Sequence, residues 1–101
     1  MRVININGTS DNICSCGSWL NHWKKFSGQS LPTYCPEKNC RNKPEVGAHV
    51  QKDDVSDKKW YIIPLCKYCN AKTKGSLDVI NSIVLVSANV KETCQKDSYN
   101  Y

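Results

Sequence analysis

Two close cysteine pairs constrain the fold of this chain more than any other feature. Cys35 and Cys40 are separated by four residues, and Cys66 and Cys69 by two, with a hairpin-sized insert between the pairs. Such short spacers let the chain curl so that both sulfurs of a pair face one point, and zinc takes four such ligands at about 2.3 Å. Two disulfides or four unrelated buried thiols are disfavoured, because nothing in the sequence suggests export. We therefore predict a four-cysteine zinc site.

The insert between the pairs predicts a β-hairpin. Residues Val46 to Val50 form a short apolar strand that contains His49, and Gly47 marks a bend or a close backbone approach. A polar loop from Gln51 to Lys59 leads to a second apolar strand, Trp60 to Leu65. A short helix is then expected from Cys66 to Lys74, so that the hairpin and the helix surround the zinc.

This order of parts resembles the zinc-stapled HNH nuclease fold, the ββα-metal variant of the treble clef, over residues 34–75. In that family a His at the end of the first strand is the general base, and a His or Asn beside the last Cys holds a catalytic divalent ion. The resemblance implies His49 as the base and Asn70 as the ligand. It also implies that Lys72 and Lys74 lie near a substrate phosphate.

The catalytic part of the resemblance is incomplete. Ala48 stands where the family usually has an acidic metal ligand, and Trp60 and Tyr61 occupy the region of its middle Asn. One Asn alone holds a hard cation weakly. The resemblance therefore implies the scaffold of the family with a degenerate catalytic site.

The segments outside the hairpin complete an α+β domain of 101 residues. We expect an N-terminal strand over Val3–Asn7, and a helix over Ser18–Phe26 with Ser18 as its N-cap and Gly28 at its end. Ser76 could cap a further helical piece. The run Ile83–Val90 is the most strand-like of the chain, and we expect it to pair with the N-terminal strand. The polar tail, 95–101, is expected to fray.

A second zinc site is a further hypothesis. The expected pairing of the two terminal strands would bring Cys94 close to Cys14 and Cys16. Together with His22, these residues would supply four ligands. The alternatives are inert or loosely paired thiols and a partly buried packing role for His22. The sequence thus predicts one zinc ion per chain, or two if this site forms.

Composition and charge favour a binding protein or a nuclease over a membrane protein. No apolar run is long enough to cross a bilayer, and the first residues lack the apolar core of a signal peptide. We therefore expect a cytoplasmic protein. The formal net charge is +5, which permits contact with nucleic acid or with an acidic protein surface. The basic residues expected at that contact are Arg41, Lys43, Lys67, Lys72 and Lys74.

Two functions follow from these patterns. One is a zinc-stapled binding module for nucleic acid or for an acidic protein, without efficient catalysis. The alternative is a metal-dependent HNH-type endonuclease in which His49 takes a proton from water and Asn70 holds the divalent ion. Of the two, we favour the binding module, because the acidic ligand is missing. The sequence does not indicate an oligomeric state.

Overall fold

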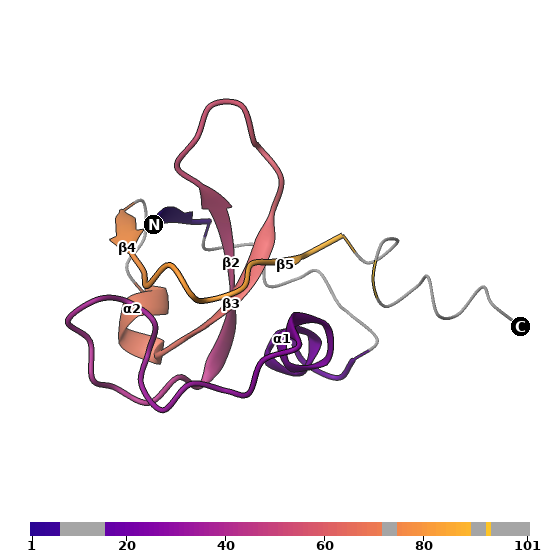
Figure 1. Cartoon of the computed structure of the whole chain (residues 1–101), viewed down its shortest axis with the longest axis vertical. Coiled ribbons are helices and arrows are strands. Elements are labelled where there is room, and N and C mark those ends of the chain that lie inside the picture. Colours follow the sequence, from indigo (N-terminus) through magenta and orange to yellow (C-terminus); the bar gives the residue numbers. More distant parts are fainter. Residues whose placement is uncertain (7–15, 72–74, 90–92, 94–101) are drawn as a thin grey trace, which may run out of the picture.

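The computed structural model describes residues 1–6, 16–71, 75–89 and 93, which form an antiparallel sheet and two helices (Figure 1). The five strands lie in the order β4-β1-β2-β3-β5. No helix in these residues is long and apolar enough to cross a membrane. The bounds are β1 Arg2–Asn5, α1 Trp19–Ser27, β2 Val46–Lys52, β3 Tyr61–Leu65, α2 Lys67–Ala71, β4 Ser76–Asp78 and β5 Val86–Ser87.

The predicted hairpin is confirmed and stands at the centre of the sheet, with its loop at the top of Figure 1. Strands β2 and β3 pair antiparallel, with His49 opposite Ile62 and Gly47 opposite Pro64. Strand β5 pairs only with Tyr61 and Ile62 of β3. Pro64 therefore lies outside the β3–β5 ladder, so its missing N–H costs that ladder no hydrogen bond.

Helix α1 also follows its sequence signals. The Ser18 hydroxyl accepts a hydrogen bond from the backbone N–H of Asn21 at 3.1 Å, as an N-cap does. At the other end, Gly28 has a left-handed φ of 69°, a conformation that costs glycine little. Trp23 is fully buried, and its indole N–H donates to the Val84 carbonyl at 2.8 Å. The helix is therefore fastened to both the sheet and the C-terminal segment.

The two helices are attached to opposite faces of the sheet. Side chains of a strand alternate between faces, so Gly47 and His49 share one face and Val50 points to the other. The backbone of α1 passes directly over Gly47. Asn5 lies opposite Val50 and donates from Nδ2 to the carbonyl of Asn70 in α2 at 2.7 Å. The core on both sides is formed by apolar residues that include Val3, Trp23, Ala48, Val50, Ile62, Ile63, Leu65, Leu77 and Val79.

The helical piece expected after Ser76 is wrong, because this segment is strand β4. It pairs with β1, and Val3 lies opposite Leu77. Leu77 and Val79 are buried while Asp78 between them is exposed, which is the two-residue period of a strand. The helix expected from Cys66 to Lys74 is observed as α2, Lys67–Ala71. Residues 72–74 are among those that the structure does not describe.

The expected pairing of Ile83–Val90 with the N-terminal strand is also wrong. Strand β1 already has β4 on one edge and β2 on the other, and the segment pairs instead with the edge of β3. There β5 forms a ladder of two residues. Before β5, the Gln29 side chain binds the chain instead, accepting from the Val84 N–H at 3.0 Å and donating to the Ser82 carbonyl at 2.8 Å.

Candidate metal centre

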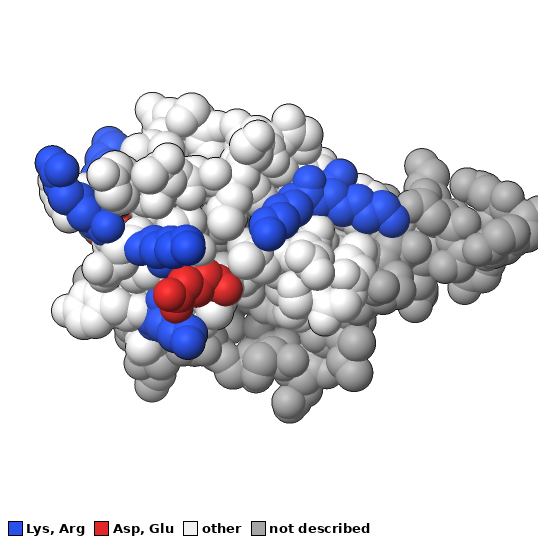
Figure 2. Space-filling view, turned by 90° about the horizontal axis from the view of Figure 1, so that it is seen from below, with Lys and Arg blue, Asp and Glu red and all other residues white. Residues whose placement is uncertain are grey.

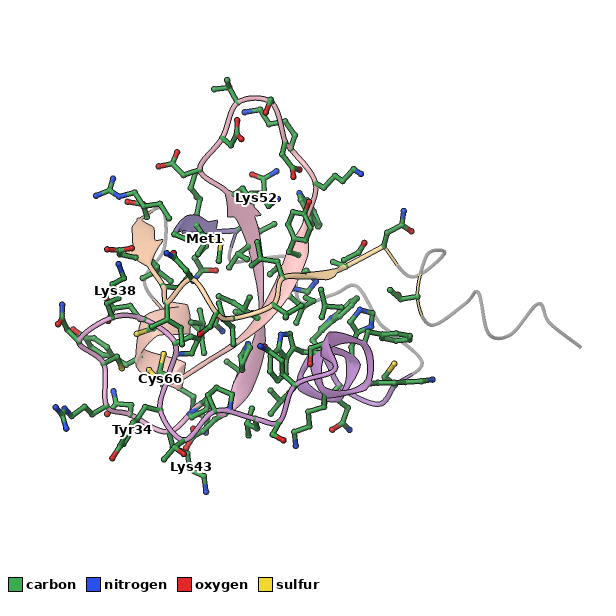
Figure 3. All side chains as sticks on the ribbon, viewed as in Figure 1. Met1, Tyr34, Lys38, Lys43, Lys52 and Cys66 are labelled. Atoms are coloured by element: carbon green, nitrogen blue, oxygen red, sulfur yellow. The ribbon has the colours of Figure 1, made fainter. Side chains whose placement is uncertain are left out.

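The four cysteines of the two close pairs meet at one point beside α2. The sulfurs of Cys35, Cys40, Cys66 and Cys69 all lie within 4.8 Å of one another, and Figure 3 shows the sulfur atoms gathered there. The Cys40 sulfur is 3.7 Å from that of Cys66 and 3.8 Å from that of Cys69. Four thiolates at about 2.3 Å from a tetrahedral metal are separated by about 3.8 Å, whereas a disulfide needs about 2.05 Å. This cluster could therefore hold one metal ion.

Backbone N–H groups orient two of the four sulfurs, those of Cys35 and Cys66. Cys66 comes directly before α2, and its sulfur accepts from the N–H of Cys69 at 3.3 Å. The N–H of Cys66 in turn points at the Cys35 sulfur at 3.4 Å. The Asn42 side chain lies 3.7 Å from the Cys66 sulfur. Hydrogen bonds of this kind to metal ligands fix their direction and partly offset their negative charge.

The loop of the first pair has its own internal bonds. The N–H of Cys35 donates to the Asn42 carbonyl at 2.7 Å, and that of Cys40 to the Glu37 carbonyl at 3.1 Å. Asn39, just before Cys40, takes a left-handed φ of 71°, which asparagine tolerates better than most residues. The loop is also bound to the segment around β4, through Lys38 N–H to Asp78 O and Ile80 N–H to Pro36 O. Sequence reasoning missed this second attachment.

The protonation of the four thiols is uneven in the absence of a cation. Burial raises the pKa of Cys35 to about 11 and also raises that of Cys69. Burial acts in the same direction on Cys66, but the N–H of Cys69 and further hydrogen bonds outweigh it and bring its pKa down to about 7. The site thus favours one thiolate, and a bound cation would supply the charge needed to ionise the others.

The two residues implied as catalytic lie on opposite sides of the sheet. Asn70 is bound through its carbonyl to Asn5, on the face of Val50. His49 points to the other face, where its ring centre is 4.6 Å from that of Trp19 and 6.2 Å from that of Trp60. Ala48 shares the face of Asn70, but it is a buried methyl group and offers no ligand oxygen.

His49 has the surroundings of a packed, neutral side chain. It is 6% exposed, and within the described part of the chain its Nε2 has no hydrogen-bond partner. Burial lowers its pKa to about 4, and the nearby His22 adds to this effect. A general base needs a pKa near the working pH and access to water. His49 in this arrangement is therefore neutral and poorly placed to take a proton from a bound water.

Basic side chains lie around the four-cysteine cluster. Arg41, Lys43 and Lys67 are exposed, and Lys67 lies 3.7 Å from the Glu45 carboxylate. Figure 2, seen from below, shows Lys and Arg side chains on the left, which is the side on which Figure 1 places α2. A further group lies toward α1. The other basic residues expected at the contact, Lys72 and Lys74, lie outside the described residues.

Two shallow grooves separate these basic side chains. The larger, about 520 Å³, runs along the first cysteine loop between Tyr34, Lys38 and Arg41. The smaller, about 230 Å³, lies between Lys43, Lys67 and Tyr68. Both tyrosines are well exposed, at 53% for Tyr34 and 67% for Tyr68. The cations could be predicted from the sequence, but these aromatic residues could not, because their exposure depends on the loop and helix that carry them.

Only part of the hypothetical second zinc site falls on described residues. Cys16 lies with its sulfur 3.9 Å from Nδ1 of His22, which is fully buried. The other two residues of that hypothesis, Cys14 and Cys94, are outside the described part of the chain.

The fold and the site define a small α+β protein with a four-cysteine cluster that could bind one metal ion. No protein-family model, curated protein or solved structure matches the chain.

Proposed function

We propose that the chain is a zinc-binding module that contacts nucleic acid through the surface around its metal centre. The order of the parts supports an HNH-like, treble-clef scaffold. A cysteine loop is followed by the β2–β3 hairpin, and α2 begins directly after it and carries the last cysteine. Two ligands come from the loop and two from the start of the helix, so one ion would bind the loop to the helix that follows the hairpin.

Zinc suits this donor set better than magnesium or calcium does. Four sulfurs at tetrahedral spacing match zinc or an iron–sulfur centre, whereas magnesium and calcium prefer oxygen ligands. One divalent ion with four thiolates carries a formal charge of about −2, by the charges of zinc and thiolate. Part of the positive charge of Arg41, Lys43 and Lys67 therefore offsets the centre itself. The exposed position of these side chains leaves them able to reach a second anion.

The observation that carries the proposal is the pairing of cations with exposed aromatic rings in the two grooves. Tyr34 and Arg41 both line one groove, and Tyr68, Lys43 and Lys67 line the other. In Figure 3 the labelled Tyr34 and Lys43 both project away from the body of the protein. Proteins that bind single strands combine cations for the phosphates with aromatic rings on which bases stack. An acidic protein surface would use the cations but has less need of the rings.

The same geometry supports binding without efficient cleavage. A hydrolytic site needs its general base and its metal ligand on the same substrate phosphate. His49 and Asn70 are separated by the sheet, and the position of the acidic ligand is a buried alanine. We therefore expect a supercoiled plasmid incubated with Mg²⁺, Mn²⁺ or Ni²⁺ to remain intact. Metal-dependent nicking that disappears in His49→Ala would restore the nuclease alternative.

Binding is tested by fluorescence anisotropy with a labelled single-stranded oligonucleotide and the zinc-loaded protein, at a series of salt concentrations. Each phosphate contact adds about 0.7 to the log–log salt slope for a single strand. Arg41→Ala/Lys43→Ala should weaken binding and lower the slope by about 1.4, by the same relation. Lys24→Ala/Lys58→Ala is the matched control, because it removes the same charge from exposed positions away from both grooves. Equal losses in both variants would show non-specific attraction by net charge.

A duplex of the same sequence separates the two kinds of nucleic acid. Bases in a duplex are stacked on each other, so the tyrosines can add little and the single strand should bind more tightly. No binding of either form at low salt would remove the nucleic-acid proposal and leave an acidic protein as the partner to seek.

A further inference from the structure

Helix α1 holds a buried histidine whose two ring nitrogens have different environments. Nε2 of His22 is 2.8 Å from the carbonyl oxygen of Ser87 in β5. A carbonyl oxygen only accepts, so Nε2 carries the proton and donates it. In the neutral ring this leaves Nδ1 with its lone pair, and Nδ1 faces the Cys16 sulfur at 3.9 Å. With the neutral ring in this tautomer, the Nδ1 lone pair and the Cys16 thiol face one point.

This arrangement is the one in which proteins use histidine as a metal ligand. A ligating histidine almost always donates its other N–H to a carbonyl or carboxylate, which sets the tautomer and the ring direction. Sulfur and nitrogen ligands of one tetrahedral zinc are about 3.6 Å apart, by the usual bond lengths. The observed 3.9 Å lies within a few tenths of an ångström of this spacing. Ring contacts with Trp19 and Phe26, at 4.9 and 5.1 Å, further fix the His22 ring.

We propose that Cys16 and His22 bind a second zinc ion, separate from the four-cysteine centre. The site would join the segment before α1 to the helix and, through the Ser87 carbonyl, to the edge strand β5. Strand β5 has only two ladder residues, so this additional link has a clear structural use. It would also hold the apolar face of α1 against the sheet, where Trp23 is buried.

The pair supplies two of the four ligands that a structural zinc takes. Within the described part of the chain, no third cysteine, histidine or carboxylate joins it. Cys14 and Cys94, which the sequence pattern suggests as further ligands, lie outside the described residues. The site is inferred from the geometry of Cys16 and His22 alone.

The test is the metal content of the full chain, purified without added metal and measured by native mass spectrometry and elemental analysis. The wild-type protein should carry two zinc ions. His22→Phe keeps an aromatic ring of similar size between Trp19 and Phe26 but has no nitrogen, and it should carry one. Cys16→Ser should also carry one. The matched control is His49→Phe. His49 is also buried and also contacts Trp19, but it is not a proposed ligand, so this variant should keep two zinc ions.

One zinc in the wild type would overturn the proposal, as would two in His22→Phe. If His22→Phe fails to fold, ¹¹³Cd NMR of the wild-type protein gives the same decision. Two cadmium resonances are then expected, one of them coupled to the ring nitrogen of His22. A second resonance without that coupling, or a single resonance, would contradict the site. Failure of the four-cysteine centre would be seen separately, because it would remove the resonance that has sulfur ligands alone.

Discussion

Gly47 and Trp19 are in such close contact that a side chain at position 47 has no room. A Cβ atom on Gly47 would lie 2.3 Å from the carbonyl carbon of Trp19 and 2.4 Å from the backbone nitrogen of Leu20. These are main-chain atoms of α1, which cannot turn aside as a flexible side chain would. The glycine therefore sets the distance between the helix and the central hairpin.

Gly47→Ala should destabilise the protein strongly. Overpacking of a core costs about 1–3 kcal/mol, and the rigid backbone on the other side places this variant at the upper end, about 3 kcal/mol. The measurement is the free energy of unfolding from urea titration. Gly75→Ala is the control, because a Cβ there meets nothing within 4 Å. It should change stability by less than about 1 kcal/mol. Equal effects of the two variants would contradict the close packing of α1 on β2.

The parts of the fold that follow local rules could be predicted from the sequence. The cap Ser18, the end at Gly28 and the hairpin around His49 are signalled by neighbouring residues, and all were confirmed. Strand β4 was mistaken for a helix because Leu77, Ile80 and Ile83 have a spacing that also suits a helical face. Its pairing with β1 depends on residues more than 70 positions away, which no local pattern reports.

The four-cysteine cluster could be predicted from the sequence, whereas the arrangement of the residues around it could not. Short cysteine spacers indicate ligands whatever the fold between them, so the four-cysteine cluster was found. The separation of His49 from Asn70 depends on strand register, because a shift by one residue moves a side chain to the other face. The resemblance to the HNH motif places His49 and Asn70 by their order in the sequence, so it could not reveal that the sheet separates them.

Removal of the metal should unfold the domain around α2. Cys66 contributes its sulfur to the centre, and the same sulfur accepts the N–H of Cys69. Metal binding of structural zinc sites is coupled to folding and is worth several kcal/mol or more. In Cys66→Ser, circular dichroism should show loss of cooperative unfolding, and the zinc content of this centre should fall to near zero. A variant that keeps both would show that the cluster is not a metal site.

Asn42→Ala should lower the metal affinity of the four-cysteine cluster while the protein still folds. This change removes the side-chain contact to the Cys66 sulfur at 3.7 Å, while the Asn42 carbonyl still accepts the N–H of Cys35. Loss of such an outer contact typically lowers metal affinity by about 10–100-fold. Competition with a chromogenic chelator measures the change. Asn21→Ala, at an exposed position of α1 on the other face of the sheet, should leave the affinity unaltered.

His49 should make the stability of the protein depend on pH. Its folded-state pKa of about 4 lies below the ordinary value of 6.5, because burial disfavours the charged ring. The contribution of the neutral His49 ring to the free energy of unfolding is therefore fully present above pH 6.5 and is lost as the pH falls toward 4. His49→Phe removes this titration. Between pH 7.5 and 5 the stability of the variant relative to wild type should rise by about 2 kcal/mol.

The comparison of two proteins at each pH cancels the loss of metal in acid, which both share. Trp60→Phe is the control, since it changes a ring 6.2 Å from His49 without removing the titrating group. Its unfolding free energy should follow the wild type in parallel. A constant difference between His49→Phe and wild type across this range would mean that His49 titrates normally.

The exposed tyrosines should contribute to binding in a way that salt does not change. Stacking of a base on an aromatic ring is worth about 1–3 kcal/mol per base and involves no counterion release. Tyr34→Leu and Tyr68→Leu should each weaken single-strand binding by roughly tenfold at every salt concentration, by this range. The log–log salt slope should stay that of the wild type. Tyr34→Phe and Tyr68→Phe keep the ring and should bind as the wild type does. A lower slope in the leucine variants, or an equal loss in the phenylalanine variants, would show that the rings do not act by stacking.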